Sequence, residues 1–182
     1  GDAAMVIGGG PIGICLVQVL KMKHAGKIIV AEILDNRKQL ALDFGATHIV
    51  DPGVVDPPAK VRRLTGSAGA DVVFDTSGVE VALNNAIHAC RTHGSIVNIA
   101  VWEKEPNIEA NELMYHEVNF MGAALYDENS FQSVIQALSD GEIKPEKMVT
   151  DKIKLDDFVE HGLEALVNDR GDHCKILVDA RA

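Results

Sequence analysis

Hydrophobic positions along the chain follow two different periods. Ala3 to Ile7 form a short, unbroken apolar run that ends at glycines, which is typical of a buried strand. From Ile12 to Leu20, apolar residues recur at i, i+3, i+4, i+7 and i+8, which is the period of an amphipathic helix. The chain therefore opens with a predicted strand, a tight turn and a predicted helix.

The alternation of strand and helix patterns continues along the chain. Predicted strands cover 27–31, 47–50, 71–74, 95–101, 118–124 and 175–178, and predicted helices cover 35–44, 58–64, 80–90, 110–115, 129–138 and 155–167. Strands separated by helices form βαβ units, whose right-handed crossovers place helices on both faces of a parallel sheet. The pattern predicts an α/β, doubly wound fold with about six parallel strands.

The composition of the chain argues against two classes of function, nucleic-acid binding and membrane association. The chain has 182 residues, 27 Asp and Glu against 17 Lys and Arg, and a net charge of −10, so we expect no binding to nucleic acid, which requires clustered cations. With 47% hydrophobic and 24% charged residues, we expect a globular domain. No apolar run approaches the roughly 20 residues of a membrane span, so no membrane association is expected.

The cysteines and the first residues indicate a cellular setting and a larger parent protein. Cys15, Cys90 and Cys174 lie far apart, without a CxxC pair, which favours reduced thiols in a cytoplasmic protein. The chain begins at Gly1 without an initiator Met, and Met5 already lies in the first predicted strand. We therefore expect the sequence to have been cut from a longer one.

The turn after the first strand carries the sequence GGGPIG, which satisfies GxGxxG between a strand and a helix. Gly8 is expected to permit the tight turn, Gly10 to let the backbone approach a pyrophosphate, and Gly13 to let the helix pack against the strand. Ile12 and Gly13 offer N–H groups at a helix N-terminus, which favours an anion. Pro11 has no N–H and shapes the turn.

Nineteen residues after Gly13, Glu32 ends the second predicted strand. A carboxylate there accepts hydrogen bonds from the hydroxyls of an adenosine ribose and repels a 2′-phosphate, so the pattern favours NAD over NADP. Arg37, one turn into the next helix, is placed to brace the ribose or the adenine. The alternative is that the glycines only make a tight crossover and that Glu32 is a solvated strand end.

Other nucleotide-binding proteins share parts of this pattern. A methyltransferase normally has an acid before its glycines and GxGxG spacing, and this chain has neither. A Tyr-x-x-x-Lys dehydrogenase is excluded, because Asn119 and Ser130 stand four residues after Tyr115 and Tyr126. A stand-alone nucleotide-sensing regulatory module would show the same first unit and remains the alternative function.

No catalytic or metal-binding residue is predicted. The histidines lie apart, without zinc-ligand spacing, and are interpreted as surface or capping residues: His24, His48, His88, His93, His116, His161 and His173. Trp102 follows a predicted strand and is a candidate to cover a cofactor or a subunit contact. The sequence thus predicts a cofactor site without its chemistry.

The ordered segments GDAAMVIGGGPIG, IIVAEILDNRKQLALDFGATHIVDP, GADVVFDTSG, GSIVNIAV and FMGAALY together resemble the cofactor-binding part of the medium-chain, zinc-dependent alcohol dehydrogenases. The resemblance covers essentially the whole chain and is greatest to the butanediol, sorbitol and threonine dehydrogenase branch. It implies a Rossmann fold, with an NAD-binding domain over residues 1–140. Residues 141–182 would return to a catalytic domain that this sequence lacks.

The resemblance also implies roles for individual residues. Gly8, Gly10, Pro11, Ile12 and Gly13 would line the pyrophosphate, and Glu32 and Arg37 would flank the adenosine ribose. Thr76 and Ser77 would border the adenine side. Backbone groups at the ends of two later predicted strands would hold the nicotinamide carboxamide: Ile99, Ala100, Val101, Ala123 and Leu125.

For the whole enzyme, the resemblance implies oxidation of a secondary alcohol or diol by zinc-assisted hydride transfer to NAD. The zinc ligands have no counterpart in this sequence, so zinc and the small alcohol substrate are expected only in the absent catalytic domain, and this chain alone is expected to be inactive. The family commonly pairs its sixth strands across a two-fold axis. A homodimer through the edge strand Glu117 to Ala124 is therefore expected.

Overall fold

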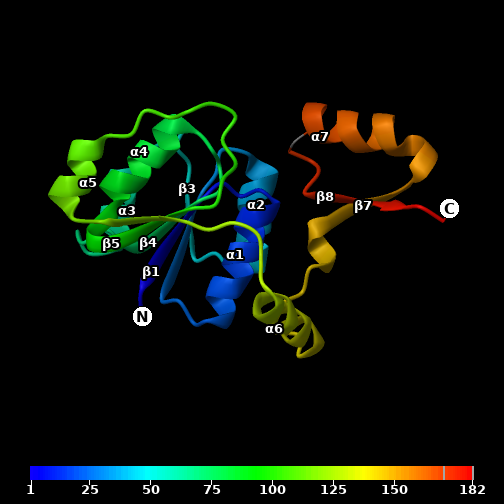
Figure 1. The fold of residues 1–182 in the computed structure, drawn as a ribbon, viewed down its shortest axis with the longest axis horizontal. Coiled ribbons are helices and arrows are strands. Elements are labelled where there is room, and N and C mark those ends of the chain that lie inside the picture. The colour runs from blue at the N-terminus through cyan, green and yellow to red at the C-terminus, as the bar shows by residue number, and fades with distance from the viewer. Residues whose placement is uncertain (170, 182) are drawn as a thin grey trace.

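A six-stranded, fully parallel sheet forms the centre of the computed structural model, which describes residues 1–169 and 171–181 (Figure 1). The strands are β1 (Ala3–Ile7), β2 (Lys27–Ala31), β3 (His48–Val50), β4 (Ala70–Asp75), β5 (Cys90–Asn98) and β6 (Asn119–Gly122). Their order in the sheet is β3-β2-β1-β4-β5-β6. This order reverses between β1 and β4, as in a doubly wound Rossmann fold, so the predicted fold class is confirmed.

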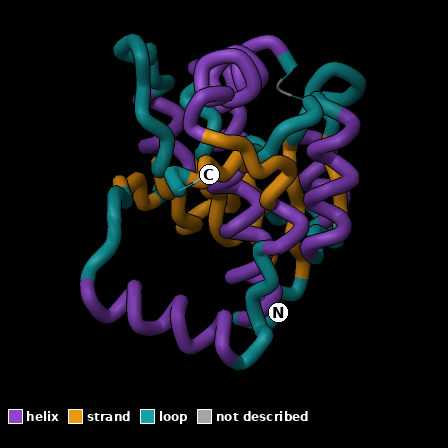
Figure 2. Tube along the Cα trace, turned by 90° about the vertical axis from the view of Figure 1, so that its right-hand side faces the viewer, coloured by secondary structure: helices purple, strands orange, loops and turns teal. Residues whose placement is uncertain are grey.

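Helices cover both faces of the sheet, as Figures 1 and 2 show. One buried cluster joins the strands to α3 (Pro57–Leu64) and α4 (Glu80–Ala89) through side chains such as Val61, Leu83 and Ile87, and α5 (Ala110–His116) packs on the same cluster through Leu113. A second cluster, on the other face, contains Ile14 and Val17 of α1 (Pro11–Met22) and Phe44 of α2 (Asp35–Phe44). The central strands β1 and β2 are buried along nearly their whole length, which explains their unbroken apolar runs.

Local sequence signals set several element boundaries. Asp56 caps α3 by accepting a hydrogen bond from the Ala59 N–H at 3.2 Å. Gly45 ends α2 with a φ of +120°, a conformation that glycine adopts without steric cost. These helices therefore begin and end close to the predicted positions.

Three segments differ from the sequence prediction. β5 begins at Cys90, directly after α4, and ends at Asn98, so Val101 lies in the following loop and is 94% exposed. The predicted helix over 155–167 is a succession of a 3₁₀ turn, η2 (Leu155–Asp157), a π-helix, η3 (Phe158–Glu164), and α7 (Ala165–Asn168). Strand β7 (Val149–Lys154) is absent from the sequence prediction, because residues 150–152 are polar and interrupt the apolar pattern that predicts a strand.

The C-terminal region, residues 141–169 and 171–181, lies beside the α1 and α2 face (Figure 1). It follows α6 (Glu128–Ser139), and it contains a short 3₁₀ turn, η1 (Glu146–Met148), and a two-stranded parallel sheet of β7 and β8 (Lys175–Asp179). Met148 and Cys174 insert into the second cluster, and buried Gln18 of α1 accepts a hydrogen bond from the Lys144 N–H at 3.0 Å. Over the described residues, no helix has both the length and the apolar character that a bilayer crossing requires.

Candidate functional site

The glycine turn joins β1 to α1 at the carboxyl edge of the sheet. Gly8 has a φ of +97°, and a Cβ there would lie 2.8 Å from the Thr76 hydroxyl oxygen. A Cβ on Gly13 would lie 1.9 Å from the Gly8 carbonyl oxygen, so only glycine allows α1 to start this close to β1. Gly10 differs, because the nearest atom to a Cβ there is an Arg37 Nη1 at 3.9 Å. The space above Gly10 is therefore open to a ligand.

The first turn of α1 has no side-chain cap. Gly10 stands at the N-cap position without a side chain, and Pro11 follows it at the first helical position. The N–H groups of Ile12 and Gly13 therefore have neither an intrahelical partner nor a capping side chain. Uncapped N–H groups at the positive end of a helix are well suited to bind a phosphate.

Glu32 ties the end of β2 to the glycine turn. Its Oε2 accepts a hydrogen bond from the Gly9 N–H at 2.7 Å, and its Oε1 accepts hydrogen bonds from the N–H groups of Ile33 and Leu34 at 2.7 and 2.9 Å. The residue is 7% exposed, so the interpretation as a solvated strand end is wrong. These bonds fix a carboxylate at the rim of the turn, one residue away from the open position at Gly10.

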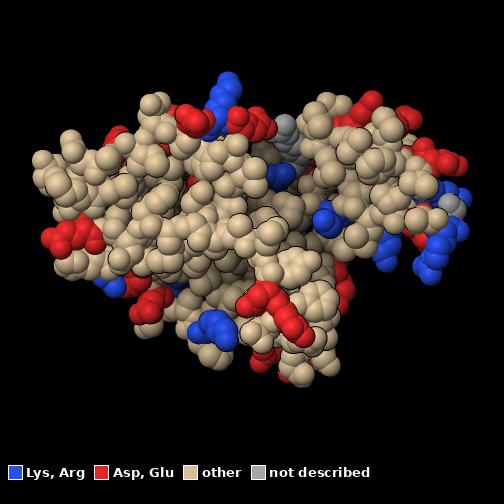
Figure 3. Space-filling view, viewed as in Figure 1, with Lys and Arg blue, Asp and Glu red and all other residues tan. Residues whose placement is uncertain are grey.

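Arg37 brings a positive charge to the same place. The guanidinium approaches Gly10, while its Nε atom is buried and has no hydrogen-bond partner among the described residues. A buried donor without a partner is costly, and an anionic or polar ligand above the turn would satisfy it. Figure 3 shows Lys or Arg residues, in blue, near the junction between the main sheet and the C-terminal region.

Thr76 and Ser77 lie after β4, next to the turn, and their hydroxyls are used within the protein. The Thr76 hydroxyl donates to the Ile7 carbonyl at 2.8 Å, which braces the start of the glycine turn. The Ser77 hydroxyl donates to Oδ1 of Asp75 at 2.8 Å. Asp75 is fully buried and its Oδ2 has no partner among the described residues, a feature that the sequence analysis missed. Its signal in the sequence is an acid that ends an apolar strand.

The residues predicted on the nicotinamide side lie after β5 and β6, farther along the same edge. The N–H groups of Ile99 and Ala100 both donate to the Asp75 carbonyl, at 2.9 and 3.1 Å, and the Ala123 N–H donates to the Asn98 carbonyl at 3.0 Å. A ligand would therefore meet their carbonyl oxygens rather than these N–H groups. Leu125 is 96% exposed with a φ of +61°.

Trp102 and the three thiols contribute no reactive group to this edge. Trp102 packs against the first cluster and donates its indole N–H to Oδ1 of Asn98 at 3.1 Å. The three cysteines are free thiols, and burial raises the pKa of Cys90 to about 11, which keeps it protonated and unreactive at neutral pH. Neither feature supplies a catalytic group to the turn.

The sequence and the structure of this chain are similar to those of known proteins. Residues 11–140 match the family described as zinc-binding dehydrogenase. The chain is 33% identical over 180 residues to (R,R)-butanediol dehydrogenase from Neisseria gonorrhoeae, covering 98% of this chain and 50% of that protein. The chain thus spans about half the length of the curated relatives it matches.

Solved structures share the fold. The crystal structure of 2R,3R-butanediol dehydrogenase from Bacillus subtilis superimposes with a TM-score of 0.90 at 37% identity, covering 98% of this chain and 50% of that chain. An alcohol dehydrogenase from Escherichia coli, solved with its cofactor NADH, superimposes with a TM-score of 0.87 at 26% identity, covering 98% of this chain and 52% of that chain.

Proposed function

The chain belongs to the zinc-binding dehydrogenase family, and we propose that it is the NAD(H)-binding part of an alcohol or polyol dehydrogenase. The observation that carries this proposal is the environment of Gly10. Open space, uncapped helix N–H groups and the unpartnered Arg37 Nε surround one position on the carboxyl edge of the sheet. A dinucleotide pyrophosphate carries the negative charge that this environment lacks.

Glu32 gives the proposal its cofactor preference. Its carboxylate is fixed by three backbone N–H groups beside the turn, where it would accept hydrogen bonds from ribose hydroxyls and repel a 2′-phosphate. When bound, the nicotinamide would accept a hydride from the alcohol. The protein would hold that ring through the segments after β5 and β6, which leave carbonyl oxygens available at the edge.

We also propose a division of labour along the sequence. Residues 1–140 would bind NAD(H), and residues 141–182 would pack on the part of the relatives' length that this chain does not span. Zinc and a secondary alcohol or diol would be bound in that part. Exposed apolar side chains in the C-terminal region, such as Val159, Leu163 and Val167, support the packing half of this proposal.

A homodimer through β6 completes the proposal. β6 lies at the edge of the sheet, all four of its residues are exposed, and Phe120 and Met121 are 41% and 46% exposed. An unpaired edge with apolar side chains favours pairing with a second copy. Sedimentation velocity over a range of concentrations tests the homodimer proposal, and a mass that stays that of a monomer contradicts it.

A cytoplasmic location of the protein also remains a prediction.

Calorimetric titration with NADH and with NADPH tests the cofactor proposal. We expect the unmodified chain to bind NADH more tightly than NADPH. Glu32→Gln should weaken NADH binding about tenfold or more, because a hydrogen bond to a charged group contributes roughly 1.5–3 kcal/mol, and should narrow the preference over NADPH. Glu128→Gln, the same change at an exposed glutamate at the start of α6, is the matched control and should bind NADH normally.

Gly10→Ala provides a second arm that does not disturb the Glu32 hydrogen bonds. Its Cβ meets no protein atom closer than 3.9 Å, so the free energy of unfolding should stay within about 0.5 kcal/mol of the original. The same Cβ would occupy the approach of the pyrophosphate and should weaken NADH binding. Unchanged NADH binding by both Gly10→Ala and Glu32→Gln would show that the turn is architectural only.

A further inference from the structure

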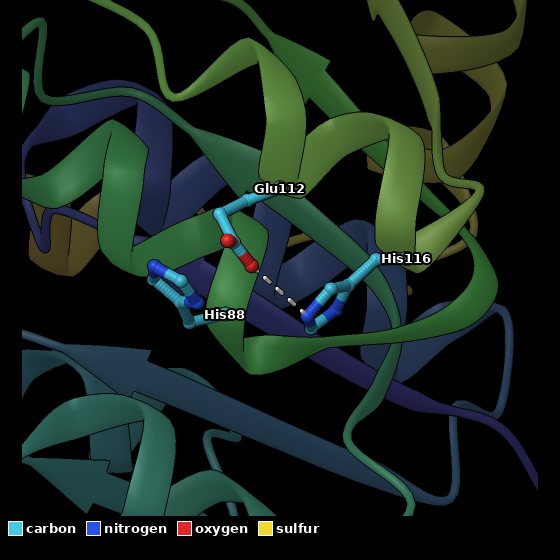
Figure 4. A group of neighbouring side chains, drawn as sticks. All are labelled: His88, Glu112 and His116. Carbon is cyan, nitrogen blue, oxygen red and sulfur yellow. Dashed lines mark ion pairs between the residues drawn. The ribbon is translucent and has the colours of Figure 1, made fainter.

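Three potential metal ligands converge away from the glycine turn. His88 lies in the last turn of α4, and Glu112 and His116 lie one turn apart on α5. One ligand atom from each residue lies within 4.8 Å of those of the other two. Figure 4 shows the Glu112 carboxylate between the two imidazoles.

The topology places this cluster at the amino edge of the sheet. In a parallel sheet, a crossover helix runs back from the carboxyl edge to the amino edge, so the C-terminal end of α4, with His88, lies where β5 begins. α5 ends at His116, three residues before β6 begins at Asn119. The cluster is therefore separated from the proposed cofactor site by the length of the strands.

Each of the two imidazoles has a carboxylate beside it, and His88 is hydrogen-bonded to its neighbour. The His88 Nε2 lies 2.7 Å from Oε2 of Glu109, and the His116 Nε2 lies 3.7 Å from Oε2 of Glu112. When His88 Nε2 donates its proton to Glu109, Nδ1 keeps a free lone pair. In Figure 4, one ring nitrogen of His88 lies on the side of Glu112 and the other points away. A carboxylate that holds the outer nitrogen of a histidine is typical of metal sites.

We propose that His88, Glu112 and His116 bind a divalent transition metal, and that Zn²⁺ suits this set of donors best. Two imidazoles and one carboxylate are ligands that Zn²⁺ accepts, with water in the fourth position. Bonds of about 2.0–2.1 Å in a tetrahedron place donor atoms about 3.4 Å apart, so on metal binding the donor atoms would approach one another by at most about 1.4 Å. The three side chains are 34%, 36% and 23% exposed, in chain order, which leaves an entry path and room for rotamer adjustment.

Such a site would be separate from the zinc of the whole dehydrogenase. It would connect α5, which has only seven residues, to the end of α4 and so fix the start of β6. A metal that binds the folded state and not the unfolded state raises the free energy of unfolding by mass action. Zn²⁺ should therefore raise the unfolding temperature of this chain.

Calorimetric titration of the chelator-stripped chain with ZnCl₂ tests the proposal, and Co²⁺ provides a second readout through its visible absorption. We expect one Zn²⁺ per chain, and at least tenfold weaker binding in Glu112→Gln and in His116→Ala. The control is His93→Gln, because His93 pairs with Glu117 at 3.6 Å and belongs to no group of three possible ligands among the described residues. His93→Gln should bind Zn²⁺ as the original chain does.

Circular dichroism establishes that each variant is folded before its affinity is compared. No Zn²⁺ binding by the original chain, or equal binding by Glu112→Gln, His116→Ala and His93→Gln, would overturn the proposal. Glu109→Gln should weaken Zn²⁺ binding about tenfold, since it removes the group that orients His88. NADH titration of His116→Ala should give the affinity of the original chain, so the outcome is independent of the cofactor proposal.

Discussion

The main sheet and the C-terminal region contain the same kinds of element but are stabilised differently. In the main sheet, the side chains of β1 are at most 8% exposed, and two clusters fill the space between strands and helices. In the C-terminal region, β8 has Leu177 and Val178 at 40% and 36% exposure. A two-stranded sheet has little stability by itself, so this region depends on what packs against it.

The junction between the two regions is narrow. Met148 and Cys174 are the buried hydrophobic residues that the C-terminal region contributes to the clusters, among residues 1–169 and 171–181. Polar contacts supplement them, including Asn36 to Asp172 at 2.7 Å. The comparison shows that a regular strand pattern does not ensure an independent core. Substitutions of the same kind should therefore have unequal effects in the two regions.

The largest difference is expected for removal of a large apolar side chain. Ile87 is fully buried between α4 and the sheet, so Ile87→Ala should lower the free energy of unfolding by about 3 kcal/mol. Leu177→Ala, in half-exposed β8, should cost less than about 1 kcal/mol. Urea denaturation followed by circular dichroism measures both, and equal losses would show that the two regions share one cooperative core.

A smaller difference is expected for the addition of a methyl group at a glycine. Gly13→Ala forces a Cβ against the Gly8 carbonyl and should cost about 2 kcal/mol, because α1 must move away from β1. Gly171→Ala, in the C-terminal region, meets no described atom within 4 Å and should be nearly neutral. Thermal unfolding of both proteins checks this, and a stable Gly13→Ala protein would mean that the turn adapts.

The smallest difference is expected for loss of a carboxylate. Asp71 accepts hydrogen bonds from the Ala3 N–H at 2.7 Å and from Arg91 Nε at 2.6 Å, and these two groups lower its pKa. The lowered pKa means that this stabilisation is present at neutral pH and is lost as the pH falls through the folded pKa, below about 4. Asp71→Asn should therefore cost about 1–2 kcal/mol at pH 7 and flatten the acid side of the stability curve.

The control for that experiment is Asp151→Asn in the C-terminal region. Asp151 pairs with His173 at 2.8 Å, but its side chain is 46% exposed, and exposed ion pairs contribute little. We expect a change within about 0.5 kcal/mol at pH 7. Free energies of unfolding measured between pH 3 and pH 7 compare the two variants, and parallel pH curves for Asp71→Asn and the original chain would contradict the assigned role of Asp71.

Local sequence determined most of the first half of the fold. The apolar run of β1, the glycine turn, the amphipathic period of α1 and the acid after β2 are each visible within a few residues, because period and turn chemistry act over short range. The same signals placed Gly8 and Gly10 in the turn between β1 and α1, and Gly13 in the first turn of α1. They also separated the helices from the strands up to β4.

Only the tertiary structure decided how distant residues meet. The burial of Glu32 depends on the Gly9 N–H, 23 residues away, and the unpartnered Nε of Arg37 depends on how α2 packs beside the turn. Strand β7 exists because β8 pairs with it, and no period in residues 149–154 reveals that partner. His88 and His116 lie 28 positions apart in the sequence, and only the crossover that brings α4 beside α5 makes them neighbours. Short-range patterns specify elements, whereas sites depend on long-range packing, which a single sequence does not display.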